Sequence, residues 1–180
     1  MRNPALLYPM FALACWTLVV LMLIPLVRVR SALRRETRAD DFKYGESAAV
    51  PGYVSIPNRN YMNLLELPML FYVVCLLLYV TGGASSLTIT LAWSYVALRG
   101  VHSAIHLSYN HVIHRLAAFS LSNVALVLLW LSAAMHLGAN ASLPGTDRAA
   151  REHLAIPISA AITREQVRAV VDQVAAATSS

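Results

Sequence analysis

The sequence predicts an all-α integral membrane protein, built as a four-helix up-and-down bundle. Three observations predict this class: an apolar composition, long stretches without charge, and short polar connectors between them. Of the 180 residues, 58% are apolar and 13% are charged, whereas a soluble domain is nearer half apolar and a quarter charged. Residues 3–27 and 116–146 contain no charged side chain, and residues 60–98 contain only Glu66. This distribution excludes an ordinary water-soluble globule and a disordered chain.

Four segments are long and apolar enough to cross a bilayer, which takes about 20 residues of helix. Hydrocarbon offers the backbone no hydrogen-bond partner, so each segment is expected to be helical. The connections after the second and third segments are short, which favours antiparallel neighbours. The predicted spans are residues 5–27, 60–81, 86–109 and 116–137, which together form a transmembrane domain over residues 1–137.

Basic residues gather in the two connections at one end of the predicted bundle. Six arginines and a lysine lie within residues 28–59, Arg115 follows the third span, and the turn at 82–86 has no basic residue. Cytoplasmic loops carry an excess of Lys and Arg. We therefore expect both basic connections in the cytoplasm and both termini on the other side, in the inner membrane if the chain is bacterial. The excess of basic residues behind the net charge of +5 is then a signal of membrane topology. We predict no nucleic-acid partner.

The C-terminal tail, residues 138–180, forms a separate piece. Thr163-Arg164-Glu165-Gln166 has the pattern of a capping box, and valines follow it at helical spacing. The pattern predicts a short amphipathic helix at about residues 164–177, on the membrane surface or on the bundle. A partly disordered tail is the alternative.

Polar side chains inside the apolar spans are the candidate functional residues, because a charge at membrane depth costs about 2.5–3.5 kcal/mol. Glu66 and Arg99 are the two charges concerned. Residues three and four apart share a helix face, so each charge has polar neighbours on its own helix. The stripe on the second span is Arg59, Asn63 and Glu66, and that on the third is Arg99, His102, His106 and Tyr109, with Arg115 opening the fourth span.

Three arginines and one carboxylate near the cytoplasmic face suit a small ligand with several carboxylates and an amine. An anionic thiol also fits, since a guanidinium lowers a thiol pKa and favours the thiolate. Apolar walls would admit a lipophilic second substrate from the bilayer.

Two other interpretations of these residues stay open. Glu66 could form a buried ion pair with Arg99 or Arg59, as polar residues that hold membrane helices together do. His102 and His106 could bind one metal ion together. A zinc site, however, normally has a third or fourth ligand, and the nearby Arg99 guanidinium repels a cation. No metal is therefore predicted.

The stripes also resemble a known pattern. Arg59-x3-Asn63-x2-Glu66, followed by Pro68 and Phe71, resembles the second-helix signature of the MAPEG family, membrane-associated proteins in eicosanoid and glutathione metabolism. The run Arg99-Gly100-Val101-His102, with Arg115 sixteen residues after Arg99, is similar to the prostaglandin-synthase branch. Val27-Arg28 matches a family position that reaches the ligand. The resemblance covers about residues 5–137 and indicates a bacterial-type member.

This resemblance implies a homotrimer of four-helix subunits that binds glutathione as a co-substrate between neighbouring subunits. It implies that Arg115 is the catalytic arginine that stabilises the thiolate, and that the second substrate is a lipophilic electrophile. His106 stands where the family usually has a tyrosine, and Tyr109 lies three residues further on. The expected glutathione-binding residues are Arg28, Arg59, Asn63, Glu66, Arg99, His102, His106 and Tyr109.

The leading function is therefore a glutathione-dependent transferase or peroxidase in the membrane. The alternative is a non-catalytic lipid-binding or scaffold protein with the same fold. A transporter or proton relay is a weaker third, because the outer half of each span is apolar and offers no polar path across the bilayer.

Overall fold

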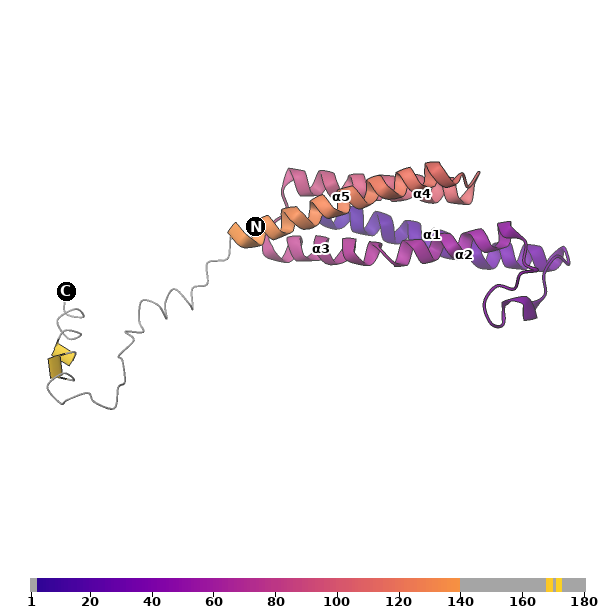
Figure 1. Ribbon diagram of the computed structural model, residues 1–180, viewed down its shortest axis with the longest axis horizontal. Helices are drawn as coiled ribbons and strands as arrows, with labels where there is room; N and C mark the ends of the chain where they lie inside the picture. Colours follow the sequence, from indigo (N-terminus) through magenta and orange to yellow (C-terminus); the bar gives the residue numbers. More distant parts are fainter. Residues whose placement is uncertain (1–2, 140–167, 170, 173–180) are drawn as a thin grey trace. The chain divides into compact units, whose positions relative to one another are not determined.

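The computed structural model describes residues 3–139, 168–169 and 171–172. The chain divides into two units, Met1–Asn140 and Ala141–Ser180. The first unit is an all-helical bundle (Figure 1). In the second unit the four described residues are helical, and the rest of the helix predicted at residues 164–177 lies outside the described residues.

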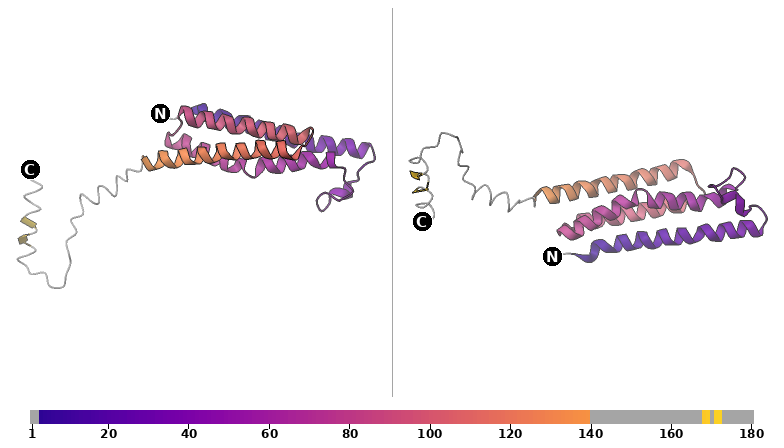
Figure 2. Two further views of the ribbon diagram at one scale, coloured as in Figure 1. Left: turned by 45° about the horizontal axis from the view of Figure 1, so that its top comes forward. Right: turned by 90° about the horizontal axis from the view of Figure 1, so that it is seen from below.

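The bundle consists of four rods that run alternately up and down (Figures 1 and 2). The second rod is formed by two helices, α2 and α3, placed end to end. The all-α, four-helix prediction is confirmed. In chain order the elements are η1 (Pro4–Leu6), α1 (Leu7–Leu33), η2 (Ala39–Phe42), α2 (Gly52–Leu65), α3 (Pro68–Thr81), α4 (Ser86–Leu107) and α5 (Val112–Ala139).

Within the described residues, three helical segments are long and apolar enough to cross a membrane: Pro4–Leu33, Gly52–Thr81 and Val112–Ala139. The protein is therefore an integral membrane protein, and its apolar outer faces contact lipid. The third predicted span, residues 86–109, corresponds to α4, whose 22 residues would extend about 33 Å. Polar residues interrupt its apolar sequence, and its place as a span stays a prediction.

Three of the four rods are longer than the apolar segments that predicted them, whereas α4 ends two residues before the predicted end at 109. α1 continues six residues past the predicted end at 27, and the second rod begins at Gly52 instead of residue 60. Arginine is a good helix former, so the charges after residue 27 end the apolar stretch without ending the helix.

The second rod is interrupted at Glu66 and Leu67, within the predicted span 60–81. Proline has no N–H to donate and its ring clashes with the preceding turn, so Pro68 ends one helix and occupies the first turn of the next. The N–H of Glu66 still donates to the Met62 carbonyl at 3.1 Å. In a continuous helix the N–H of Leu67 would donate to the Asn63 carbonyl, and that carbonyl has another partner here.

The turn between α3 and α4 is closed by two glycines and a cap. Gly82 adopts φ 75°, a left-handed conformation that glycine takes without strain, and Gly83 N–H donates to the Leu78 carbonyl at 2.8 Å. Ser85 Oγ then accepts the Thr88 N–H at 3.2 Å and starts α4. This local chemistry sets the tight reversal that the sequence predicted.

We expect Gly83→Ala to destabilise the bundle. A Cβ there would lie 2.7 Å from the His136 ring and 2.8 Å from Leu78 Cδ2, and such overpacking costs about 1–3 kcal/mol. Thermal unfolding in detergent measures the effect. Gly138→Ala is the control, because a Cβ at that helical position meets no atom within 4 Å; equal unfolding temperatures for the two variants would contradict the prediction.

The core of the bundle is apolar along most of its length. Its buried residues come from η1 and all five α-helices. The connection between α1 and α2 and the turn between α4 and α5 lie at the same end (Figures 1 and 2), where the polar residues on α2 and α4 also gather. The core residues include Leu6, Leu13, Val20, Leu64, Phe71, Val74, Leu78, Tyr95, Leu126 and Leu129.

Candidate functional site

A fully buried arginine lies at the centre of the polar end of the bundle. Arg99 on α4 is 0% exposed, and its Nη2 donates to the backbone carbonyl of Asn63. This is the carbonyl that the break after α2 releases from helical hydrogen bonding. The guanidinium carbon also lies 5.6 Å from the centre of the Phe119 ring. Within residues 3–139, Nε and Nη1 of Arg99 are buried and have no acceptor, so this group can still bind an anion or a carbonyl.

Two histidines follow Arg99 on the same face of α4. His102 Nδ1 lies 3.1 Å from the Arg115 carbonyl, and because a carbonyl only accepts, Nδ1 carries the hydrogen. His102 Nε2 and His106 Nδ1 are buried without a partner in the described part of the chain. The two rings are 5.9 Å apart, centre to centre. This face therefore offers ring nitrogens to a ligand.

Arg115 lies in the first turn of α5 and is fixed by the preceding turn. Its Nη1 donates to Asn110 Oδ1 at 2.6 Å, and its backbone N–H donates to the His111 carbonyl at 3.0 Å. Asn110 has φ 47°, in the left-handed region that asparagine tolerates better than most residues. The turn thus positions the Arg115 backbone against His102 and holds one edge of its guanidinium.

α2 faces α4 through a residue that the sequence stripe did not include. Asn60 is fully buried and its Nδ2 donates to Ser103 Oγ at 2.5 Å. Sequence reasoning missed both residues, although a polar residue at position 60 beside Arg59, and another beside His102, were visible signals. Asn60 fixes the rotation of α2, and this turns the predicted stripe away from α4.

The predicted stripe on α2 faces outward. Arg59 and Glu66 are exposed, and Asn63 is half-buried. The Asn63 amide donates to the Arg59 carbonyl of its own helix at 3.0 Å. Within residues 3–139 no ion pair of 4 Å or less joins Glu66 to Arg99 or Arg59, and the Glu66 side chain is exposed.

The remaining predicted ligands are Tyr109 and Arg28. Tyr109 is exposed in the turn that follows α4, with its hydroxyl 3.1 Å from His114 Nδ1. Arg28, near the end of α1, pairs with Glu46 at 3.4 Å and lies 4.5 Å from the centre of the Phe42 ring. The structure thus brings Arg99, His102, His106 and Arg115 together. Arg59 and Glu66 lie at the exposed edge of this cluster, where their charges act on His106 and Arg99, and Tyr109 and Arg28 have partners elsewhere.

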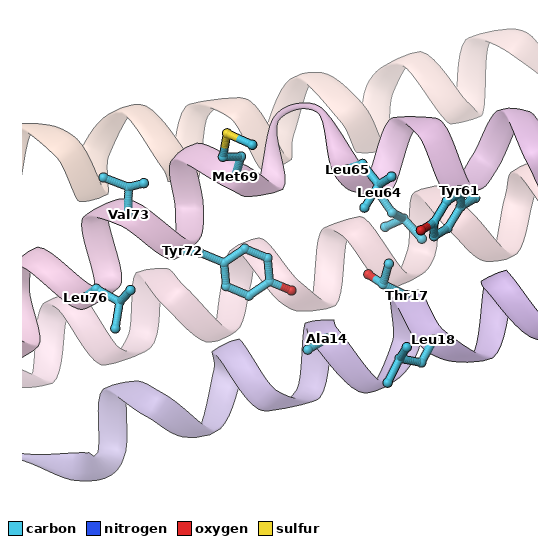
Figure 3. A pocket seen from close by; sticks show the side chains of 10 residues that line it. All are labelled: Ala14, Thr17, Leu18, Tyr61, Leu64, Leu65, Met69, Tyr72, Val73 and Leu76. Carbon is cyan, nitrogen blue, oxygen red and sulfur yellow. The ribbon is translucent and has the colours of Figure 1, made fainter.

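An apolar pocket of about 530 Å³ lies between α1 and the broken second rod (Figure 3). Leu65 and Met69 flank the break, and the Tyr72 hydroxyl points toward Thr17 from the opposite helix. Such a pocket accepts an apolar ligand, and three hydroxyl-bearing side chains line it: Thr17, Tyr61 and Tyr72. The lining residues are Ala14, Thr17, Leu18, Tyr61, Leu64, Leu65, Met69, Tyr72, Val73 and Leu76.

The described part of the chain contains no group of three or more His, Cys, Asp or Glu side chains placed to hold a metal ion. The chemistry available at the polar end comes from two arginines and two histidines. Arginine forks bind carboxylates and stabilise thiolates, so this end of the bundle suits an anionic ligand.

The family model described as "MAPEG family" matches residues 6–135. No curated protein and no solved structure matches the chain. The matched region begins in η1 and ends in the last turns of α5, and so contains every residue of the polar end.

Proposed function

This chain belongs to the MAPEG family of membrane proteins in eicosanoid and glutathione metabolism, and on that basis we propose that it is a glutathione-dependent transferase or peroxidase. In this proposal Arg115 stabilises the glutathione thiolate, which attacks a lipophilic electrophile at the membrane. The observation that carries it is the cluster of Arg99, His102 and Arg115 around the turn between α4 and α5.

The geometry of Arg115 supports its catalytic role. Asn110 holds one side of the guanidinium at 2.6 Å, which restricts the side chain to few conformations. A fixed cation beside a thiol favours the thiolate, the nucleophilic form. A transferase, a peroxidase and an isomerase could all start from this thiolate.

The exposed charges on α2 support a site completed by a neighbouring subunit. Glu66 and Arg59 face outward from the single chain, and an uncovered charge in a membrane span is costly. In a glutathione molecule bound between subunits, the ammonium group would pair with Glu66 and a carboxylate would pair with Arg59. We therefore propose a homotrimer with intersubunit sites.

The orientation that we propose follows from the basic residues in the connections. Both basic connections lie in the cytoplasm and both termini lie on the other side.

The apolar pocket beside the break supports a lipophilic second substrate (Figure 3). The same pocket also favours the second candidate function, a non-catalytic lipid-binding protein with this fold. The two candidates differ in whether glutathione binds as a thiolate.

A titration of the purified protein with glutathione, followed by ultraviolet thiolate absorbance, tests the proposal. We expect a saturable thiolate signal and conjugation of a chlorodinitrobenzene. S-methylglutathione is the matched control: it has no free thiol, so it should compete for the site and give no thiolate signal. Absence of glutathione binding in both detergent and lipid nanodiscs would reject the enzyme and leave the lipid-binding protein.

A further inference from the structure

Residues 34–51, which we call the strap, are folded against the end of α1. Thr37 donates from Oγ1 to Ser31 Oγ at 3.0 Å, and both side chains are buried. Asp41 Oδ2 accepts the Arg38 N–H at 2.7 Å and closes the first turn of η2. A connection held by buried and capped hydrogen bonds has a defined conformation, so the side chains it presents have defined positions.

The strap places two side chains against Arg28. Glu46 Oε1 lies 3.4 Å from Arg28 Nη2, and the Phe42 ring centre lies 4.5 Å from the Arg28 guanidinium carbon. The Glu46 side chain is 14% exposed and that of Arg28 is 34% exposed. The strap therefore covers much of this arginine with a carboxylate and an aromatic ring.

Arg28 is one of the residues that the resemblance to the MAPEG family implies as a glutathione ligand. The Glu46 carboxylate has the same chemistry as the two carboxylates of glutathione, and it already occupies one nitrogen of the guanidinium. Arg28 Nε is buried and has no acceptor among residues 3–139. Arg28 thus binds a carboxylate from its own chain, and its Nε–H remains available as a hydrogen-bond donor.

We propose that Glu46 is an internal competitor of glutathione, which a glutathione carboxylate must displace from Arg28. The strap then acts as a gate: it is closed when Glu46 holds Arg28 and open when a ligand carboxylate replaces it. The exchange of one carboxylate for another conserves charge at the arginine and selects for ligands that carry a carboxylate at that point. This inference rests on the proposed function, since it requires glutathione as the ligand, and on Arg28 being one of its contacts.

Glutathione affinity of Glu46→Gln in lipid nanodiscs tests the gate. Glutamine keeps the shape of the side chain and removes its charge, so glutathione should bind about two- to fivefold more tightly, the size expected for a partly exposed ion pair. The gain should vanish in the Arg28→Gln background, because the two residues act on one interaction. Asp40→Asn is the matched control: it removes the same charge from η2 without touching this ion pair, and should leave the affinity unchanged.

Amide hydrogen exchange of the wild-type protein gives a second readout. Saturating glutathione should speed exchange over residues 39–50 as Glu46 leaves Arg28. If the wild type binds glutathione but Glu46→Gln binds no tighter, or the gain persists without Arg28, or Asp40→Asn gives the same gain, the gate is rejected and the proposed function stands. Unchanged exchange also rejects the gate. If neither the wild type nor Glu46→Gln binds glutathione, both the gate and the proposed function fail.

Discussion

Arg115→Ala is expected to abolish the glutathione thiolate signal and to slow conjugation by about 10²- to 10³-fold, the usual cost of removing one group that stabilises developing negative charge. An ordinary thiol has a pKa of about 8.5, so only a few per cent of it is ionised near pH 7. A guanidinium at the sulfur raises that fraction. Stopped-flow absorbance for the thiolate and steady-state conjugation of a chlorodinitrobenzene measure the two effects on the same preparation.

The controls for this prediction separate charge from geometry. Arg115→Lys keeps the charge but loses the planar fork that Asn110 holds at 2.6 Å, so it should recover part of the thiolate signal. Arg30→Ala removes an exposed arginine from the last turn of α1 and should leave the rate unchanged. A normal thiolate signal in Arg115→Ala would show that another group activates the thiol.

Arg99→Met is expected to weaken glutathione binding by about tenfold or more while leaving the unfolding temperature unchanged or raised. The guanidinium is fully buried, and no carboxylate forms an ion pair with it in residues 3–139. Its acceptor in the described residues is a neutral carbonyl, which offsets little of the cost of burying the charge, so an apolar side chain of similar size is expected to be neutral or stabilising. Hydrogen bonds to a charged group contribute about 1.5–3 kcal/mol to binding, which gives the expected loss of affinity.

Calorimetry for glutathione binding and thermal unfolding in detergent, measured on one preparation, check this prediction. Asn60→Leu is the comparison, because Asn60 donates to Ser103 within the subunit and is expected to act through packing. That variant should lower the unfolding temperature. If Arg99→Met instead lowers the unfolding temperature and leaves glutathione affinity intact, Arg99 is structural.

The sequence predicted the helices well because hydrocarbon requires them. A long segment without charge has one stable form in a bilayer, so the four rods followed from composition. Their ends did not, because arginines such as Arg28 and Arg30 stop an apolar segment without stopping a helix. Pro68 was visible and so was the stripe around it, yet a continuous span was predicted where the rod breaks.

The candidate site was predicted in part, and the reason lies in rotation. Spacing along α4 placed Arg99, His102 and His106 on one face, and the structure buries all three. Spacing along α2 grouped Arg59, Asn63 and Glu66 equally well, but spacing fixes only which residues share a face. It does not say which face meets a neighbour, and here Asn60 meets α4 instead.

The contacts of the strap with Arg28 could not be predicted from the sequence, for another reason. Glu46 and Phe42 lie in a segment without periodicity, and their contact with Arg28 depends on hydrogen bonds such as Thr37 to Ser31. Contacts of this kind join residues that no helical repeat relates.

The break in the second rod has a consequence for redesign of this subunit. Arg99 is held by a main-chain oxygen of residue 63, so the contact does not depend on which side chain position 63 carries. An engineer could therefore rewrite the outer face of α2 for a different ligand and keep Arg99 in place. Two residues would have to be retained: Asn60, which sets the rotation of α2, and Pro68, whose ring ends the helix before it.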